Sequence, residues 1–201
     1  MKLSFRALVI GAVLSLSACA SPQVRYHTLV SPEPFVDAAT PVPFVIEVLP
    51  VGVPAQLDTQ QVIVRQGDSR VAVLNNDRWL SPLGDELQTA LSSQIARRLG
   101  TQDASGLPRD DGKPVVRILI QIRRFDGSPG NGVALDADWS LSARRGQQRS
   151  RLLCRSHLTQ SAAGDYTQLF TAWQSLMGRM ATQIAQTAAQ WSADGAEACP
   201  H

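Results

Sequence analysis

Apolar residues recur along the chain at the two-residue spacing of strands in several short runs. Residues 44–51, 61–65 and 70–74 are rich in Val and Ile, which favour strands. The last two runs flank a polar turn, Gly67-Asp68-Ser69, and are therefore expected to form a hairpin. The shorter run at 25–30 (RYHTLV) is also β-prone and is a candidate first strand.

Two segments show helical periodicity instead. In the first, an apolar residue recurs every fourth position, at Leu83, Leu87, Leu91, Ile95 and Leu99. Ser81 is predicted to be its N-cap, Pro82 its first residue, and Gly100 its end. The second helix is expected to begin at Gly164-Asp165 and to run to about residue 193. Arg179 alone is charged between residues 166 and 193, so this helix is expected to bury more than one face.

Three longer alternating runs lie between the two predicted helices. Residues 115–125, 133–145 and 150–161 are separated by turns, the first of which is Gly127–Gly132 (GSPGNG). They predict a β-meander with one apolar face and one polar face. The order of the elements predicts an α+β fold, with a mixed, mainly antiparallel sheet and two helices packed on one side.

Composition narrows the class of protein. The 201 residues are 44% hydrophobic and 18% charged, with 14 Gly and 12 Pro, which excludes a disordered or collagen-like chain. The net charge of +2 gives no basic excess for binding nucleic acid. No apolar run reaches the roughly 20 residues of a membrane-spanning helix.

The N-terminus has the pattern of a bacterial lipoprotein signal. Lys2 and Arg6 precede the apolar stretch 7–16, and Leu-Ser-Ala-Cys at 16–19 resembles the lipobox. This resemblance implies cleavage before Cys19 and its acylation, including the fatty acyl (palmitate) chains of such anchors. Ala20, in place of an Asp that favours the inner membrane, implies the outer membrane with the domain facing the periplasm. The alternative is an ordinary secreted protein with a chance cysteine.

The chain is accordingly divided into four parts. We expect a lipoprotein signal peptide at 1–18, a lipidated Pro-rich tether at 19–43, a folded domain at 44–193 and a C-terminal tail at 194–201. Loss of Lys2 and Arg6 with the signal makes the mature chain formally neutral.

Two cysteines remain after Cys19 is assigned to lipid. In an oxidising compartment, Cys154 and Cys199 are predicted to form a disulfide, worth roughly 3–4 kcal/mol in the chain-entropy model. A catalytic pair is the alternative, but neither cysteine has a His or an acid beside it in a known pattern.

The motifs of enzymes and cofactor sites are missing from the sequence. His27, His157 and His201 form no metal-binding pair, and there is no Gly-x-Ser-x-Gly. Asp136 and Asp138 share the polar side of a predicted strand and are interpreted as solvated. We therefore expect neither an enzyme nor a cofactor or metal.

Four stretches together resemble the ABC-type transport auxiliary lipoproteins, and among them the paraquat-inducible protein C-like lipoproteins. They are Tyr26–Leu29 (YHTL), Ile46–Pro54 (IEVLPVGVP), Asn75–Leu83 (NNDRWLSPL) and the helix from Ala172-Trp173 to Ile184-Ala185. The resemblance covers residues 19–192. His27 departs from it, because the family usually has a second Tyr there, and the Cys154/Cys199 pair is not treated as a family feature.

The resemblance implies a non-enzymatic role in intermembrane phospholipid transport. The lipoprotein would receive, at the outer membrane, the far end of a periplasm-spanning MCE-domain protein whose other partner is an integral inner-membrane protein. Homo-oligomeric rings and phospholipid cargo are implied as well. The alternatives are an accessory lipoprotein of another envelope system, for lipopolysaccharide export or ABC efflux, and a periplasmic hydrolase. Trp79 and Trp173 are candidate partner-binding residues, with burial in the core as the alternative.

Overall fold

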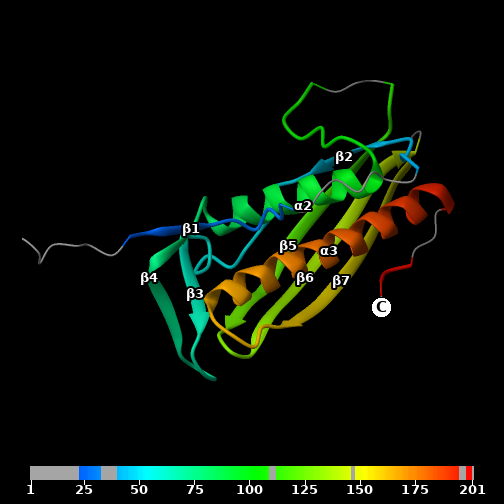
Figure 1. Ribbon diagram of the computed structural model, residues 1–201. Helices are drawn as coiled ribbons and strands as arrows, with labels where there is room; N and C mark the ends of the chain where they lie inside the picture. Colours follow the sequence, from blue (N-terminus) through cyan, green and yellow to red (C-terminus); the bar gives the residue numbers. More distant parts are fainter. Residues whose placement is uncertain (1–22, 33–39, 109–111, 146–147, 195–197, 201) are drawn as a thin grey trace, which may run out of the picture.

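The computed structural model describes residues 23–32, 40–108, 112–145, 148–194 and 198–200 (Figure 1). Two helices and seven strands lie within this part of the chain. They are β1 (Arg25–His27), β2 (Val45–Val48), β3 (Gln61–Arg65), β4 (Val71–Trp79), α2 (Leu83–Leu99), β5 (Val115–Ser128), β6 (Gly132–Arg145), β7 (Gln148–Ser161) and α3 (Tyr166–Asp194).

The strands form two sheets. One has the order β2-β5-β6-β7, and the other has the order β1-β4-β3. Within each sheet one pair is parallel, β2 with β5 and β1 with β4, and the remaining pairs are antiparallel. The predicted α+β fold with a mixed, mainly antiparallel arrangement is therefore confirmed. The division into two sheets was not predicted, because strand periodicity does not specify which strands pair.

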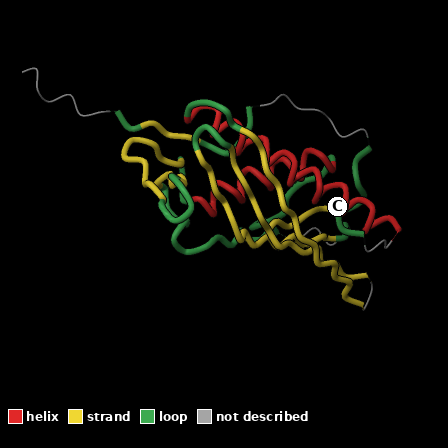
Figure 2. The backbone as a smooth tube through the Cα atoms, turned by 90° about the horizontal axis from the view of Figure 1, so that it is seen from below, coloured by secondary structure: helices red, strands yellow, loops and turns green. Residues whose placement is uncertain are grey.

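Both helices lie on one side of the four-stranded sheet and pack against each other (Figures 1 and 2). In β5 the side chains of Ile118, Ile120 and Ile122 are buried beneath them, whereas Arg117 and Leu119 point to the opposite face. The leucine stripe of α2 is buried from Leu83 to Leu99, as its spacing predicts. One core therefore lies between the helices and this sheet.

The helix ends predicted from the sequence are confirmed in part. Gly100 ends α2 in the left-handed conformation, with φ of 59°, as predicted. Asp165 caps α3 by accepting bonds from the N–H groups of Thr167 and Gln168, at 3.0 and 3.3 Å. The N-cap predicted at Ser81 is wrong: α2 begins at Leu83 after Pro82, and no side chain caps it. The Ser81 hydroxyl donates instead to the Glu86 carboxylate.

The folded domain begins well before residue 44. β1 is hydrogen-bonded to β4, and Leu29 is fully buried. The prolines that suggested a tether oppose helix but allow extended chain, and a strand distant in sequence supplies the partner. The described segment 23–32 thus belongs to the domain. Within the described residues, no helix is both long enough and apolar enough to cross a membrane.

Candidate functional site: the N-terminal docking cluster

The segment that follows the predicted lipidation site is held against the domain by side chains from three other elements. Its residues contact the end of β4, the first turn of α2 and the first half of α3. We call this group the N-terminal docking cluster, defined as Arg25, His27, Thr28, Leu29, Asp77, Glu86, Phe170 and Gln174. Three of the four family-like stretches thereby meet in one place.

Asp77 forms the first contact of the cluster. Its carboxylate is buried and accepts two bonds from the Arg25 guanidinium, from Nε at 2.9 Å and from Nη2 at 2.8 Å. Nε2 of His27 lies 2.7 Å from the same carboxylate. Burial acts to raise the pKa of Asp77, but the bonds and charges of Arg25 and His27 outweigh it and lower that pKa. The cluster therefore stabilises an ionised carboxylate beneath β1.

Glu86 forms the second contact. Its Oε2 accepts bonds from the Thr28 hydroxyl at 2.8 Å and from the Leu29 N–H at 3.0 Å, and its Oε1 accepts from Ser81 at 3.1 Å. Gln174 of α3 donates to the Thr28 carbonyl at 2.9 Å. The backbone of residues 28 and 29 is thus bonded to both helices, which fixes where the N-terminal segment enters the domain.

Aromatic rings complete the cluster. The His27 ring stacks on Phe170 with centroids 3.5 Å apart. Behind it, Trp173 packs edge-on against Trp79 and stacks on Phe125 at 5.2 Å. Trp79 is 2% exposed and Trp173 is 0% exposed. In this structure both belong to the core, which was the alternative interpretation, and neither presents a surface to a partner.

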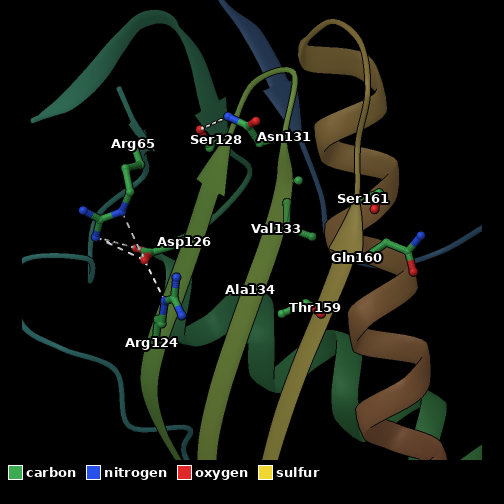
Figure 3. Close-up of a pocket in the computed structure, with 11 residues that line it drawn as sticks. Arg65, Arg124, Asp126, Ser128, Asn131, Val133, Ala134, Thr159, Gln160 and Ser161 are labelled. Atoms are coloured by element: carbon green, nitrogen blue, oxygen red, sulfur yellow. Dashed lines mark hydrogen bonds and ion pairs between the residues drawn. The ribbon is translucent and has the colours of Figure 1, made fainter. Parts of the chain in front are cut away.

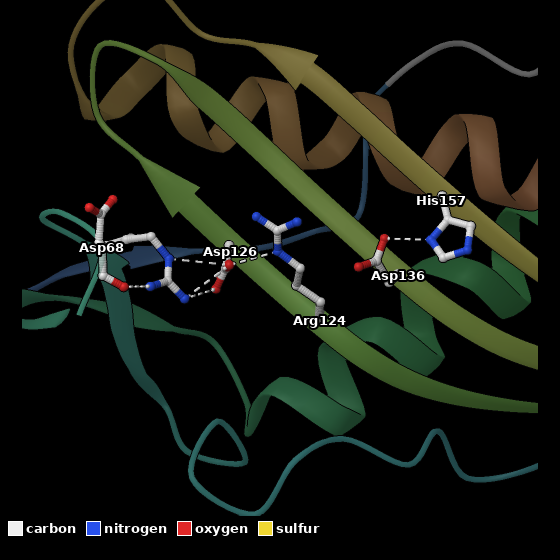
Figure 4. Close-up of polar contacts among 6 residues, drawn as sticks. Asp68, Arg124, Asp126, Asp136 and His157 are labelled. Atoms are coloured by element: carbon white, nitrogen blue, oxygen red, sulfur yellow. Dashed lines mark hydrogen bonds and ion pairs between the residues drawn. The ribbon is translucent and has the colours of Figure 1, made fainter. Parts of the chain in front are cut away.

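Ion pairs occupy the opposite face of the four-stranded sheet. Asp126 accepts from Arg65 and Arg124 at one end of a cleft of about 450 Å³ (Figure 3). Burial acts to raise the pKa of Asp126, but these two arginines lower it overall. Arg65 also donates to the carbonyl of Asp68 (Figure 4).

The two aspartates that the sequence placed on a solvated face lie on this surface. Asp138 is bonded to Arg155 and Arg123, which lower its pKa, and Asp136 lies 3.0 Å from Nδ1 of His157 (Figure 4). In the part of the chain that the structure describes, no three His, Cys, Asp or Glu residues are placed to hold a metal ion. These contacts bind one strand to the next.

Two of the three cysteines lie among the described residues. Cys154 and Cys199 form a disulfide with Cα atoms 5.4 Å apart, which joins β7 to the C-terminal tail. Cys19 lies outside the described residues.

Sequence reasoning missed the contacts made by Asp77, Glu86 and Gly127. Glu86 carried a signal, because it lies three residues after Leu83, on the apolar side of α2. Asp77 follows two asparagines and had none. Gly127 was assigned to a turn but lies within β5, where a Cβ atom would stand 2.3 Å from the Trp173 ring. The GSPGNG stretch still contains the turn between β5 and β6, and the Asn131 N–H donates to the Ser128 carbonyl there.

Comparison with solved structures shows the same fold. One, described only as an uncharacterized protein, has a TM-score of 0.63 and 18% identity over 83% of this chain and 99% of its own. A second, a Xanthomonas campestris protein assigned to the family model DUF330, has a TM-score of 0.58 and 15% identity over 88% and 97%. No curated protein matches the chain significantly.

The family comparison covers most of the chain. The model of the ABC-type transport auxiliary lipoprotein component matches residues 27–185, from the docking cluster to the last third of α3. The chain therefore belongs to the family of ABC-type transport auxiliary lipoprotein components.

Proposed function

We propose that this protein is an outer-membrane lipoprotein that docks a periplasm-spanning MCE assembly and takes part in phospholipid transport between the membranes. The family match supports an auxiliary role in transport. The lipobox-like segment supports acylation at Cys19, and Ala20 supports the outer membrane. The role requires no catalysis by this chain.

The observation that carries the proposal is the docking cluster. Asp77 and Glu86 hold the segment 25–29 against β4 and α2, so that a lipid attached at Cys19 is six residues from a fixed point of the domain. Six residues span at most about 20 Å. An anchor this short holds the domain close to its membrane, as a receptor for the end of a long periplasmic assembly requires.

Co-purification from membranes tests the docking role. The full lipoprotein, extracted in mild detergent after cross-linking, should retain the MCE protein encoded in the same cell and, through it, the inner-membrane partner. A Cys19→Ser variant, which has no anchor, serves as the control for anchoring and should leave the outer-membrane fraction. Recovery of a lipopolysaccharide-export or efflux complex, with no MCE protein, would favour the alternative system.

The oligomeric state belongs to the same proposal. Ring assembly is expected from the family resemblance, and a ring would present several docking surfaces around one axis. Mass measurement of the detergent-solubilised complex, by light scattering or native mass spectrometry, distinguishes a ring from a monomer.

A further inference from the structure

Exposed apolar side chains gather on the three-stranded sheet. In the described part of the chain eight large hydrophobic residues are exposed, and five of them lie on this sheet or directly beside it. These five are Val24, Tyr26, Val71, Val73 and Leu80. Apolar side chains scattered singly are normal, but a group on one small sheet indicates a surface that is covered by something else.

The register of the strands places these residues on one side. Gln61 of β3 pairs with Arg78 of β4, and Ile63 pairs with Val73. Between these two pairs β3 has one residue, whereas β4 has four. The three extra residues reverse the alternation of β4, so Val73 lies on the same side as Arg78. Tyr26 pairs with Arg78 and is 62% exposed, so it extends the same outer surface.

The inner side of this sheet is ordinary core. Val62 and Val64 are buried, and Ala72 and Leu74 pack against the core cluster. Val71, by contrast, is 60% exposed. The outer side therefore carries exposed valines among polar residues, namely Gln61, Arg65 and Arg78, whereas the wet face of a sheet is normally polar.

The position of β1 indicates what covers the outer side. β1 is one of the two edge strands of this sheet and lies at the same end of the molecule as β3 and β4 (Figure 1). Cys19 precedes Arg25 by six residues, or at most about 20 Å. Because the docking cluster fixes β1 to β4 and α2, an acyl chain at Cys19 would bring this whole sheet to the bilayer that holds it.

The polar residues around the patch agree with a lipid surface. Arg70 is exposed beside it, and Arg25 is exposed but bonded to Asp77. Arg78 lies on β4 between Tyr26 of β1 and Gln61 of β3. The carboxylates on this side are Asp68, in the turn of the hairpin, and Asp126, which is bonded to Arg65 beside Val71. Arginine near apolar side chains suits anionic headgroups, and Tyr is enriched at the boundary between water and hydrocarbon.

We propose that the outer side of the three-stranded sheet rests on the bilayer surface, with Tyr26, Val71, Val73 and Leu80 in contact with lipid. The proposal depends on the acylation of Cys19 that is part of the proposed function. It gives the domain a fixed orientation: the far end, where β6 ends and β7 begins, faces away from the membrane (Figure 1).

Fluorescence quenching by lipid tests this contact. The full lipidated chain carries one introduced cysteine, at Val73→Cys or at the control Leu119→Cys, and is labelled with nitrobenzoxadiazole. Val73 and Leu119 are 45% and 43% exposed, but Leu119 lies on the four-stranded sheet. In vesicles of phosphatidylethanolamine and phosphatidylglycerol with spin-labelled lipid, the probe at 73 should shift to the blue and be quenched. The probe at 119 should do neither.

The outcomes separate this proposal from the one on which it depends. Protein that is acylated at Cys19 and bound to vesicles, yet unquenched at position 73, overturns the bilayer contact alone. If mass spectrometry shows that Cys19 is unmodified, both the anchor and the bilayer contact are overturned. The probe at 73 could instead shift to the blue without being quenched, and lose that shift when the protein is diluted in the vesicles. This result would show that a second copy of the chain covers the patch, and it would overturn the lipid contact. Tyr26→Cys provides a second labelling site should the variant at 73 fail to fold.

Discussion

Removal of the Glu86 carboxylate should detach the N-terminal segment from α2. In Glu86→Ala, the Leu29 N–H is left buried without its partner, while the hydroxyls of Thr28 and Ser81 can turn to other acceptors. Hydrogen bonds to a charged group contribute about 1.5–3 kcal/mol, and a buried donor left unpaired costs about 1–3 kcal/mol. We expect the free energy of unfolding to fall by about 2–4 kcal/mol, a large part of the 5–15 kcal/mol typical of a domain.

Two measurements on the mature chain check this expectation. Urea denaturation followed by far-ultraviolet circular dichroism gives the loss of stability, and hydrogen exchange at the Leu29 amide reports release of the segment. Asp85→Ala is the matched control, because Asp85 is exposed in the same first turn of α2 and also faces the helix dipole. It should cost about 0.3–1 kcal/mol and leave the Leu29 amide protected. Equal losses in the two variants, with Leu29 still protected in Glu86→Ala, would refute the reasoning.

Three further predictions concern other contacts. Gly127→Ala should lower the free energy of unfolding by about 1–3 kcal/mol, because its Cβ would lie 2.3 Å from the Trp173 ring. Adding Trp173→Phe to the same chain should recover part of that loss. A Gly127→Ala variant as stable as the original chain would contradict the close packing. Thiol titration of the denatured, unreduced chain begun at residue 20 should find no free thiol, since Cys154 is bonded to Cys199, and two free thiols would exclude the disulfide. Cys199→Ser should lower the free energy of unfolding by about 2–4 kcal/mol. The pKa of Asp77 is lower in the folded protein than its ordinary value of about 3.9, so the stability that it adds is complete above about pH 4 and is lost as the pH falls through its folded pKa. Asp77→Asn should therefore reduce the drop in urea midpoint below pH 4, and an unchanged drop would exclude Asp77 as its source.

Periodicity was sufficient for the elements themselves. The stripe from Leu83 to Leu99 predicted α2 and the face that it buries, and Gly100 predicted its end. The alternation around Ile118 predicted the buried face of β5. These features follow from the local geometry of helix and strand, so neighbouring residues are enough to specify them.

The candidate site could be predicted only in fragments. The family-like stretches were visible as separate motifs, but nothing in them showed that His27 stacks on Phe170 or that Leu29 is bonded to Glu86. The two partners of that bond are 57 positions apart. Such contacts depend on which distant segments the chain brings together, and the pattern of neighbouring residues does not specify that pairing.

The sequence by itself determined the class of fold, the helices and the apolar faces, since each depends on the order and spacing of nearby residues. The tertiary structure alone decided that the strands divide between two sheets and that residues 25–29 belong to the domain. It also decided that Trp79 and Trp173 are core residues rather than exposed ones. The same tryptophan suits a core or an interface, because its large apolar ring gains from burial in either. Only the packing of β5 and α3 around it selects between them.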